Sequence, residues 1–320
     1  MYIILHITIL NMCKLYFIRL YKLFLKSKYI YINIMFNCMY STQGDFICNK
    51  NTIENFNVSS TTSSTPNMNC IFCCIFNQEK YVDMFFLLLE SIFIYGNLNN
   101  NTHILVYTST EFMNKIKQSH LFNNEKIKFE INDTYNNIEK ACKSKLDLFN
   151  LPSITNYNKI LYLDTDILVN NHINMVFNVC KEDILYVLNE GTIDDESDYY
   201  GLTLFGKDIN NYNDKSAFTS SILLFNNCKK IKDLFIKINE DIIKRPFKFS
   251  TYDQPYIVYN AFKYNLYNNK ILKTFAGNYN ENIYTDKVIY HFPGYPEQYE
   301  QKLEIMTIVL NNNKAYIDTI

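Results

Sequence analysis

The chain has 320 residues, of which 48% are hydrophobic, and its 31 Lys and Arg nearly balance its 32 Asp and Glu, for a net charge of -1. This hydrophobic fraction is enough to bury a core, which excludes a wholly disordered chain. The absence of excess positive charge argues against general nucleic-acid binding, because a phosphate backbone has to be neutralised by Lys and Arg.

Residues 1–67 are predicted to form an N-terminal extension outside the folded domain. Residues 1–36 are apolar but repeatedly interrupted by Lys and Arg, which is compatible with a helix on a membrane surface, whereas residues 41–66 are rich in Ser, Thr and Asn, as in a flexible linker. Alternatively, translation begins at Met68, directly before the first good strand pattern. We therefore expect a cytoplasmic protein, or a membrane-associated one if residues 1–36 act as an anchor. Residues 311–320 are expected to form a tail.

From residue 68 onward, strand and helix patterns alternate. Short apolar runs predict strands, and apolar residues that recur every three or four positions predict helices. This alternation predicts a single α/β domain over residues 68–310, with a mainly parallel central sheet flanked by helices. Ligands of such sheets bind beyond the carboxyl ends of the strands. Strands are predicted over residues 69–76, 103–107, 127–131, 159–163 and 218–225, and helices over residues 81–95, 111–120, 137–150 and 229–245.

Two aspartates, Asp164 and Asp166, directly follow the predicted strand at residues 159–163. In extended backbone, residues i and i+2 point to the same side, so both carboxylates can face one divalent cation. Two carboxylates suit Mg²⁺ or Mn²⁺, and such a cation can neutralise a departing diphosphate. The alternative is that both residues belong to a turn, with one of them capping the next element.

The segment that contains this pair resembles a known family. Residues 158–171, with the sequence NKILYLDTDILVNN, resemble the Asp-x-Asp segment of the family 8 glycosyltransferases, the group that includes glycogenin. Three further blocks match in the expected order: KSKLDLFNLP at 143–152, TYDQPYIVYN at 251–260 and VIYHFPGYPEQYEQKLEIM at 288–306. The resemblance spans about residues 69–306, and the order of four blocks is more specific than any one of them.

This resemblance implies a single domain of the GT-A fold that requires Mn²⁺ and transfers a sugar with retention of anomeric configuration. The implied donor is a nucleotide sugar, most simply UDP-glucose or UDP-galactose, and the acceptor is not identified. The implied metal ligands are Asp164, Asp166 and His291, and an imidazole as the third ligand favours Mn²⁺ over Mg²⁺. His172, which follows the aspartate pair closely, is a rival for the third position.

The resemblance also implies the residues that bind the nucleotide sugar. Tyr81 is expected to stack on the base, Gly294 to let the backbone approach the diphosphate, and Lys302 to offset the diphosphate charge. Asn77, at the end of the first strand, and Thr165, between the two aspartates, are expected to contact the donor. Simpler alternatives are core packing for Tyr81 and a solvated helix position for Lys302.

Lys145, Asp253 and Gln254 are the implied catalytic residues. Lys145 corresponds to a lysine that reaches the donor, and the other two lie beside the reacting sugar. In a retaining reaction, Asp253 either attacks the anomeric carbon or, with Gln254, positions and stabilises a cationic sugar; the residues themselves leave both routes open. The simpler alternative for Asp253 is an N-cap at the start of a helix.

One departure from the family pattern motivates a second function. Where the family usually has Asn-Ser-Gly, this chain has Thr219, Ser220 and Ser221, which adds side-chain bulk near the expected donor sugar. The alternative function is therefore a catalytically silent nucleotide-sugar-binding or scaffold protein of the same fold. A third hypothesis is a membrane-tethered structural protein organised by residues 1–36. The sugar, the acceptor and the formation of a homodimer are left open.

Overall fold

The computed structural model describes residues 68–122, 125–246, 249–279, 287–294 and 299–317. The expectations for residues 1–67 fall outside these described residues. Within them, no helix combines the length and the apolar character needed to span a membrane. The C-terminal helix α9 (Tyr299–Ile317) includes most of the segment that the sequence assigned to a tail.

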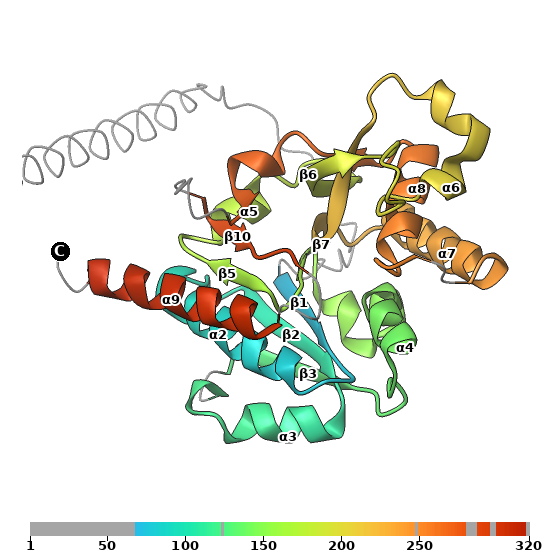
Figure 1. Cartoon of the computed structure of the whole chain (residues 1–320). Helices are drawn as coiled ribbons and strands as arrows, with labels where there is room; N and C mark the ends of the chain where they lie inside the picture. Colours follow the sequence, from blue (N-terminus) through green and yellow to red (C-terminus); the bar gives the residue numbers. More distant parts are fainter. Residues whose placement is uncertain (1–67, 123–124, 247–248, 280–286, 295–298, 318–320) are drawn as a thin grey trace, which may run out of the picture. The chain divides into compact units, whose positions relative to one another are not determined.

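A sheet of seven strands forms the centre of the domain, in the order β3-β2-β1-β4-β7-β6-β8 (Figure 1). The strands β3, β2, β1 and β4 are mutually parallel, and β7 runs antiparallel to both of its neighbours. The predicted mainly parallel α/β sheet is thus confirmed. The strands are β1 (Asn69–Ile75), β2 (Thr102–Thr108), β3 (Ile127–Ile131), β4 (Lys159–Leu163), β6 (Leu185–Thr192), β7 (Ser216–Asn226) and β8 (Tyr267–Asn268).

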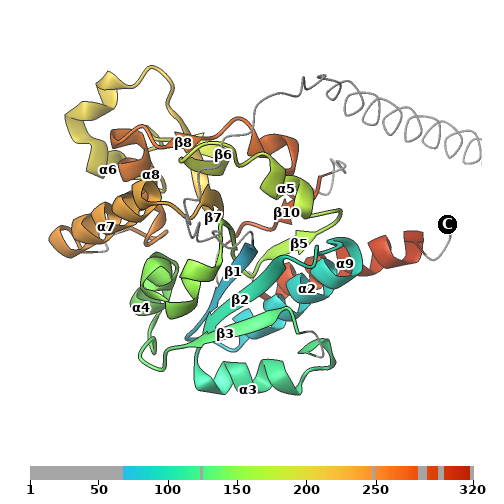
Figure 2. The same cartoon turned by 180° about the vertical axis from the view of Figure 1, so that it is seen from behind.

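Both faces of the sheet are buried, as expected for parallel strands. Along β1, Ile71 packs into the cluster that contains the apolar face of α2, whereas Phe72 packs into the opposite cluster with α7. Figure 2 shows the domain from behind, with α3 alongside β3 at one edge of the sheet. The helices are α2 (Lys80–Tyr95), α3 (Thr110–Gln118), α4 (Ile138–Lys143), α5 (Asn174–Asn178), α6 (Leu202–Phe205), α7 (Lys229–Lys244), α8 (Gln254–Lys263) and α9.

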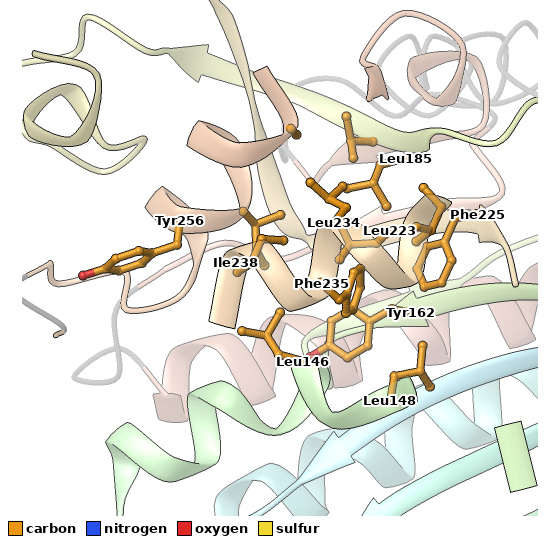
Figure 3. Close-up of a cluster of buried hydrophobic side chains, with 14 of the residues drawn as sticks. Leu146, Leu148, Tyr162, Leu185, Leu223, Phe225, Leu234, Phe235, Ile238 and Tyr256 are labelled. Atoms are coloured by element: carbon orange, nitrogen blue, oxygen red, sulfur yellow. The ribbon is translucent and has the colours of Figure 1, made fainter. Parts of the chain in front are cut away.

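The core under α7 follows the predicted helical pattern. Five apolar residues that recur along this helix are all buried, and they pack on β4 and β7 (Figure 3). The rings of Phe225 on β7 and Phe235 on α7 lie 5.6 Å apart between centroids, a favourable aromatic separation. The buried residues of α7 are Ile231, Leu234, Phe235, Ile238 and Ile242.

One predicted helix is wrong in its second half. The segment expected to form a single helix over residues 137–150 is α4 followed by 3₁₀ turns over Ser144–Asn150. In a 3₁₀ helix, side chains three positions apart lie on the same line, and here Lys145 and Leu148 are both buried. Lys145 thus lies in the interior, where it takes part in the site described below.

A second sheet of three short strands lies beside the carboxyl end of β4. It consists of β5 (Ile167–Val169), β10 (Ile289–His291) and β9 (Ala276–Asn278), in the order β5-β10-β9. The antiparallel register of β5 and β10 pairs Ile167 with His291, and the parallel register of β10 and β9 pairs His291 with Asn278. This small sheet therefore brings a distant part of the chain next to the predicted aspartate pair.

Candidate active site

A cavity of about 500 Å³ opens at the carboxyl end of β4. Its position agrees with the rule that ligands of α/β sheets bind beyond the carboxyl ends of the strands. Ten of the eleven predicted site residues line it: Tyr81, Lys145, Asp164, Thr165, Asp166, Asp253, Gln254, His291, Gly294 and Lys302.

Asn77 is the predicted site residue that does not line the cavity. It lies in the turn between β1 and α2 with a φ of +72°, a left-handed conformation that Asn tolerates better than most residues. In this structure Asn77 is a turn residue.

Asp164 is held as an ionised carboxylate. The hydroxyl of Tyr162 donates a hydrogen bond to its Oδ1, and the Lys145 ammonium lies 3.7 Å from the same oxygen. Burial alone would raise the pKa of Asp164, but Lys145 and the Tyr162 hydroxyl outweigh it, and the pKa is lowered. The strand β4 ends at Leu163 and the backbone bends at Thr165 and Asp166 before β5 begins, so the pair lies in a bend and not in extended backbone as predicted. Neither aspartate caps the next helix, α5, so that part of the alternative is not supported.

Asp166 and His291 face each other across the seam between β5 and β10. The backbone N–H of Phe292 donates to the carbonyl of Asp166 over 2.9 Å, which places the two side chains together. Nε2 of His291 lies 3.8 Å from Oδ1 of Asp166. This Oδ1 is buried and has no hydrogen-bond partner among the described residues, whereas the other oxygen, Oδ2, accepts a hydrogen bond from Lys302 over 2.8 Å.

The orientation of His291 is set by two residues that the sequence analysis missed. Its Nδ1 lies 2.9 Å from Oδ1 of Asn278, and Nδ2 of Asn278 donates to Oε2 of Glu190 over 3.2 Å. Because Nδ2 of Asn278 is engaged with Glu190, its Oδ1 is the acceptor, and Nδ1 of His291 carries the proton. In the neutral ring, Nε2 then carries the lone pair, on the side of Asp166.

His172, the rival third ligand, lies elsewhere. It is exposed, and its Nδ1 is 3.0 Å from Nδ2 of Asn97. It does not line the cavity. Of the two candidates, only His291 reaches the aspartate pair.

The residues present fit a divalent cation. Two carboxylates and one imidazole are the donor set that suits Mn²⁺, and the unpartnered Oδ1 of Asp166 points to a missing positive partner. Within the described ranges, no three His, Cys, Asp or Glu side chains are already drawn together as a ready metal site. Instead, the ammonium of Lys302 lies on Asp166 and that of Lys145 lies near Asp164.

Lys145 links Asp164 to Asp253 in the interior of the cavity wall. Its ammonium lies 3.2 Å from Oδ2 of Asp253 and 4.7 Å from the centre of the Tyr162 ring. Burial would lower the pKa of Lys145, but the two aspartates raise it above its ordinary value, so the lysine is charged. The pKa of Asp253 is raised, because burial outweighs the attraction of Lys145.

Asp253 occupies the N-cap position of α8, as the simpler alternative predicted, but its carboxylate does not cap the helix. The Asp253 side chain makes no capping hydrogen bond. Gln254 is fully engaged with the protein: its Oε1 accepts from the N–H of Ser220 over 2.9 Å, and its Nε2 donates to the carbonyl of Tyr199 over 3.2 Å. The amide of Gln254 therefore ties β7 to the loop before α6.

The departure from the family pattern lies on the cavity wall. Thr219, Ser220 and Ser221 all line the cavity, and the hydroxyl of Ser220 lies 3.4 Å from the Lys145 ammonium. The side chains at these three positions therefore take up space on the cavity wall, and that of Ser220 does so close to Lys145.

Comparison with known proteins gives structural matches only. No protein-family model and no curated protein matches the chain. Among solved structures, the apo bifunctional glycosyltransferase WbbM matches with a TM-score of 0.54 at 14% identity, over 82% of this chain and 54% of that one. The galactosyltransferase LgtC, in complex with donor and acceptor sugar analogues, matches with a TM-score of 0.52 at 14% identity, over 77% and 96% of the two chains. Apo mouse xyloside xylosyltransferase 1 matches with a TM-score of 0.51 at 12% identity, over 72% and 99%.

The chain has the GT-A glycosyltransferase fold. This confirms the fold that the four sequence blocks implied. At 12 to 14% identity the likeness concerns the fold, and the chain spans about half of WbbM.

One end of the GT-A cavity is aromatic. The Lys80 ammonium lies 5.6 Å from the ring centre of Tyr81 and 5.5 Å from that of Tyr299, and all three residues line the cavity. The hydroxyl of Tyr299 donates to Oδ2 of Asp83 over 2.8 Å. Burial raises the pKa of Tyr81 to about 12, so its hydroxyl stays protonated. Tyr299 was missed in the sequence because one Tyr among 27 carries no signal.

Proposed function

We propose that this chain is a Mn²⁺-dependent, retaining glycosyltransferase that moves a hexose from a UDP-sugar to an acceptor. The observation that carries the proposal is the approach of His291 Nε2 to within 3.8 Å of the unpartnered Oδ1 of Asp166. These groups lie at the carboxyl end of β4, in a cavity of about 500 Å³ within a GT-A fold. This is the place and the chemistry that a metal-bound nucleotide diphosphate requires.

In this proposal, Asp164, Asp166 and His291 hold the cation. When bound, the cation would neutralise the diphosphate as it leaves. Asn278 keeps the Nε2 lone pair of His291 available, and Tyr162 holds the Asp164 carboxylate in place. The chain's own contribution is thus an oriented set of ligands with one oxygen left free for the cation.

Asp253 and Lys145 form the charged wall beside the reacting sugar. The ammonium compensates Asp253 at 3.2 Å, so a carboxylate can persist although it is only 7% exposed. That carboxylate would either attack the anomeric carbon or stabilise positive charge on the sugar. Gln254 has a positioning role, because both ends of its amide are engaged with Ser220 and Tyr199.

The donor is proposed from the same geometry, and the acceptor from the comparison with LgtC. The aromatic end of the cavity at Tyr81 and Tyr299 suits a flat base, and the metal ligands suit the diphosphate that follows it. LgtC was solved with donor and acceptor sugar analogues, and we extend a nucleotide-sugar donor and a sugar acceptor to this chain. UDP-glucose and UDP-galactose are the donors to test first.

The test is release of UDP. Full-length protein is incubated with Mn²⁺ and UDP-glucose or UDP-galactose, and free UDP is measured over time. We expect release above the protein-free blank, its loss in Asp166→Asn, and its retention in the control Asp208→Asn, an exposed aspartate outside the cavity. Absence of release with every common sugar nucleotide, from protein that demonstrably binds Mn²⁺, would contradict the proposal.

A second candidate is a silent nucleotide-sugar-binding protein. It is favoured by Ser220 and Ser221, whose side chains take up space on the cavity wall, that of Ser220 next to Lys145. Calorimetry distinguishes the two functions: binding of UDP-glucose without turnover, unaffected by Asp253→Ala, would support the silent protein. Turnover that Asp253→Ala abolishes would exclude it.

A further inference from the structure

The ammonium of Lys302 lies directly on Asp166, one of the proposed metal ligands. It donates to Oδ2 of Asp166 over 2.8 Å and to the carbonyl of Gly294 over 3.3 Å. Its side chain is only 11% exposed, so the solvated-helix alternative does not apply. Lys302 is far from Asp166 in the sequence. It lies in the first turn of α9, and both residues line the cavity.

The two oxygens of Asp166 have different surroundings. Oδ2 is neutralised by Lys302, whereas Oδ1 is buried, unpartnered in the described part of the chain, and turned toward His291. A divalent cation on this carboxylate would share a single negative charge with a nearby ammonium. Like charges a few ångströms apart in a buried site repel strongly, so cation and ammonium compete for Asp166.

Lys145 is held mainly by residues other than the proposed metal ligands. It is 8% exposed, lies 3.2 Å from Asp253, and also reaches the carbonyl and the hydroxyl of Ser220 at 3.4 Å. Its distance to Asp164 is longer, at 3.7 Å, so most of its interactions are independent of the metal ligands. Of the two lysines, Lys302 is the one whose closest contact is to a metal ligand.

We propose that Lys302 couples the binding of the divalent cation to the binding of the nucleotide diphosphate. Without nucleotide, Lys302 pairs with Asp166 and opposes the cation. A diphosphate gives the ammonium a new anionic partner, so that Asp166 is released to the metal. Each ligand then raises the affinity for the other by the same factor, as thermodynamic linkage requires. This inference rests on the proposed function, because it uses the same metal and nucleotide site.

The experiment measures Mn²⁺ binding directly, through the electron paramagnetic resonance signal of free Mn²⁺, with and without UDP. Full-length protein is compared with Lys302→Met, which keeps the aliphatic stem but removes the charge. Lys314→Met is the matched control. Lys314 lies on the same helix as Lys302 and makes an equally short ion pair, to Glu90 of α2 at 2.8 Å, outside the cavity. Circular dichroism checks that each variant is folded.

We expect Lys302→Met to bind Mn²⁺ about tenfold more tightly than the wild type in the absence of UDP, as one charged contact to Asp166 is removed. The enhancement of Mn²⁺ affinity by UDP should shrink in this variant by a similar factor and stay unchanged in Lys314→Met. Equal or weaker Mn²⁺ binding by Lys302→Met without UDP would overturn the inference.

The outcomes separate this inference from the proposed function. Mn²⁺ binding that shows the expected coupling, in protein without transfer activity, supports the role of Lys302 and contradicts the enzyme. UDP release with uncoupled Mn²⁺ and UDP binding supports the enzyme and contradicts the role of Lys302. No Mn²⁺ binding by wild type or by Lys302→Met, with or without UDP, overturns both.

Discussion

Nε2 of His291 lies 3.8 Å from Oδ1 of Asp166, and the Nδ1 on the other side of the same ring is held by Asn278. One side of the imidazole is thus fixed by the protein, while the other faces an unpartnered carboxylate oxygen. In metal sites this arrangement fixes the tautomer and the direction of the ligand lone pair. The first prediction follows from it.

Asn278→Ala should weaken Mn²⁺ binding by about 10- to 100-fold, the usual effect of removing a partner of a metal-binding histidine. The imidazole loses the acceptor for its Nδ1 proton and can rotate or change tautomer. Mn²⁺ affinity in the presence of UDP is the measurement. Asn136→Ala is the control, because this exposed asparagine lies outside the cavity. Unchanged affinity in Asn278→Ala would show that His291 is oriented by other means.

Lys145→Met should destabilise the fold, because it leaves Asp253 buried without its positive partner. Removing one partner of a buried ion pair lowers the free energy of unfolding by about 3–5 kcal/mol. The double variant Lys145→Met with Asp253→Asn should recover part of this loss, since no uncompensated charge remains at that position. Urea unfolding of the wild type, both single variants and the double variant completes the cycle.

The control for this cycle is Lys215→Met. Lys215 pairs with Asp194 at 2.9 Å, but both side chains are more than a third exposed, so water replaces the lost contact. We expect little change in its urea midpoint. If the Lys145 and Asp253 substitutions turned out to be strictly additive, the two residues would not interact as described.

The pH dependence of stability should reveal the raised pKa of Asp253, which burial causes although Lys145 opposes it. Below the ordinary carboxyl value of 3.8, Asp253 is protonated in both the folded and the unfolded chain. Between 3.8 and its raised folded-state pKa, the unfolded chain has lost the proton and the folded chain still holds it. The contribution of Asp253 to the free energy of unfolding therefore falls as the pH rises through that window, and this contribution is constant at higher pH.

The measurement is the unfolding free energy of the wild type minus that of Asp253→Asn, taken at several pH values from below 3.8 upward. The asparagine variant cannot titrate at this position, and the subtraction removes groups that behave alike in both proteins. The difference should decrease with rising pH. A difference that increases would mean that the folded protein lowers this pKa.

Two isoleucines on α7 give a test of the packing. Ile238 is fully buried in the cluster of Figure 3, whereas Ile243 is 77% exposed. Ile238→Ala should cost about 2–5 kcal/mol of unfolding free energy, and Ile243→Ala should stay within about 0.5 kcal/mol of the wild type. Both changes replace isoleucine by alanine on the same helix, so urea unfolding of the pair compares a buried position with an exposed one. Equal costs would mean that α7 does not pack on the sheet through this face.

The sequence was sufficient for the elements that depend on local patterns. The strands β1 to β4 and the helices α2, α3 and α7 lie where apolar runs and helical spacing predict them, because burial of a strand or of a helix face is written into neighbouring residues. The position of Asp164 and Asp166 at the end of a strand was readable for the same reason. The predicted α-helix was wrong over residues 144–150, which form 3₁₀ turns in which Lys145 is buried.

The sequence by itself determined an α/β domain with two aspartates at the carboxyl end of β4, and the family resemblance nominated His291. Only the tertiary structure decided that His291 and not His172 meets the pair, that Asn278 and Glu190 support it, and that Lys302 lies on Asp166. The physical reason is that these contacts depend on the pairing of β10 with both β5 and β9 and on the first turn of α9. Such partners are chosen by packing between segments far apart in the chain, and no local pattern of residues records that choice.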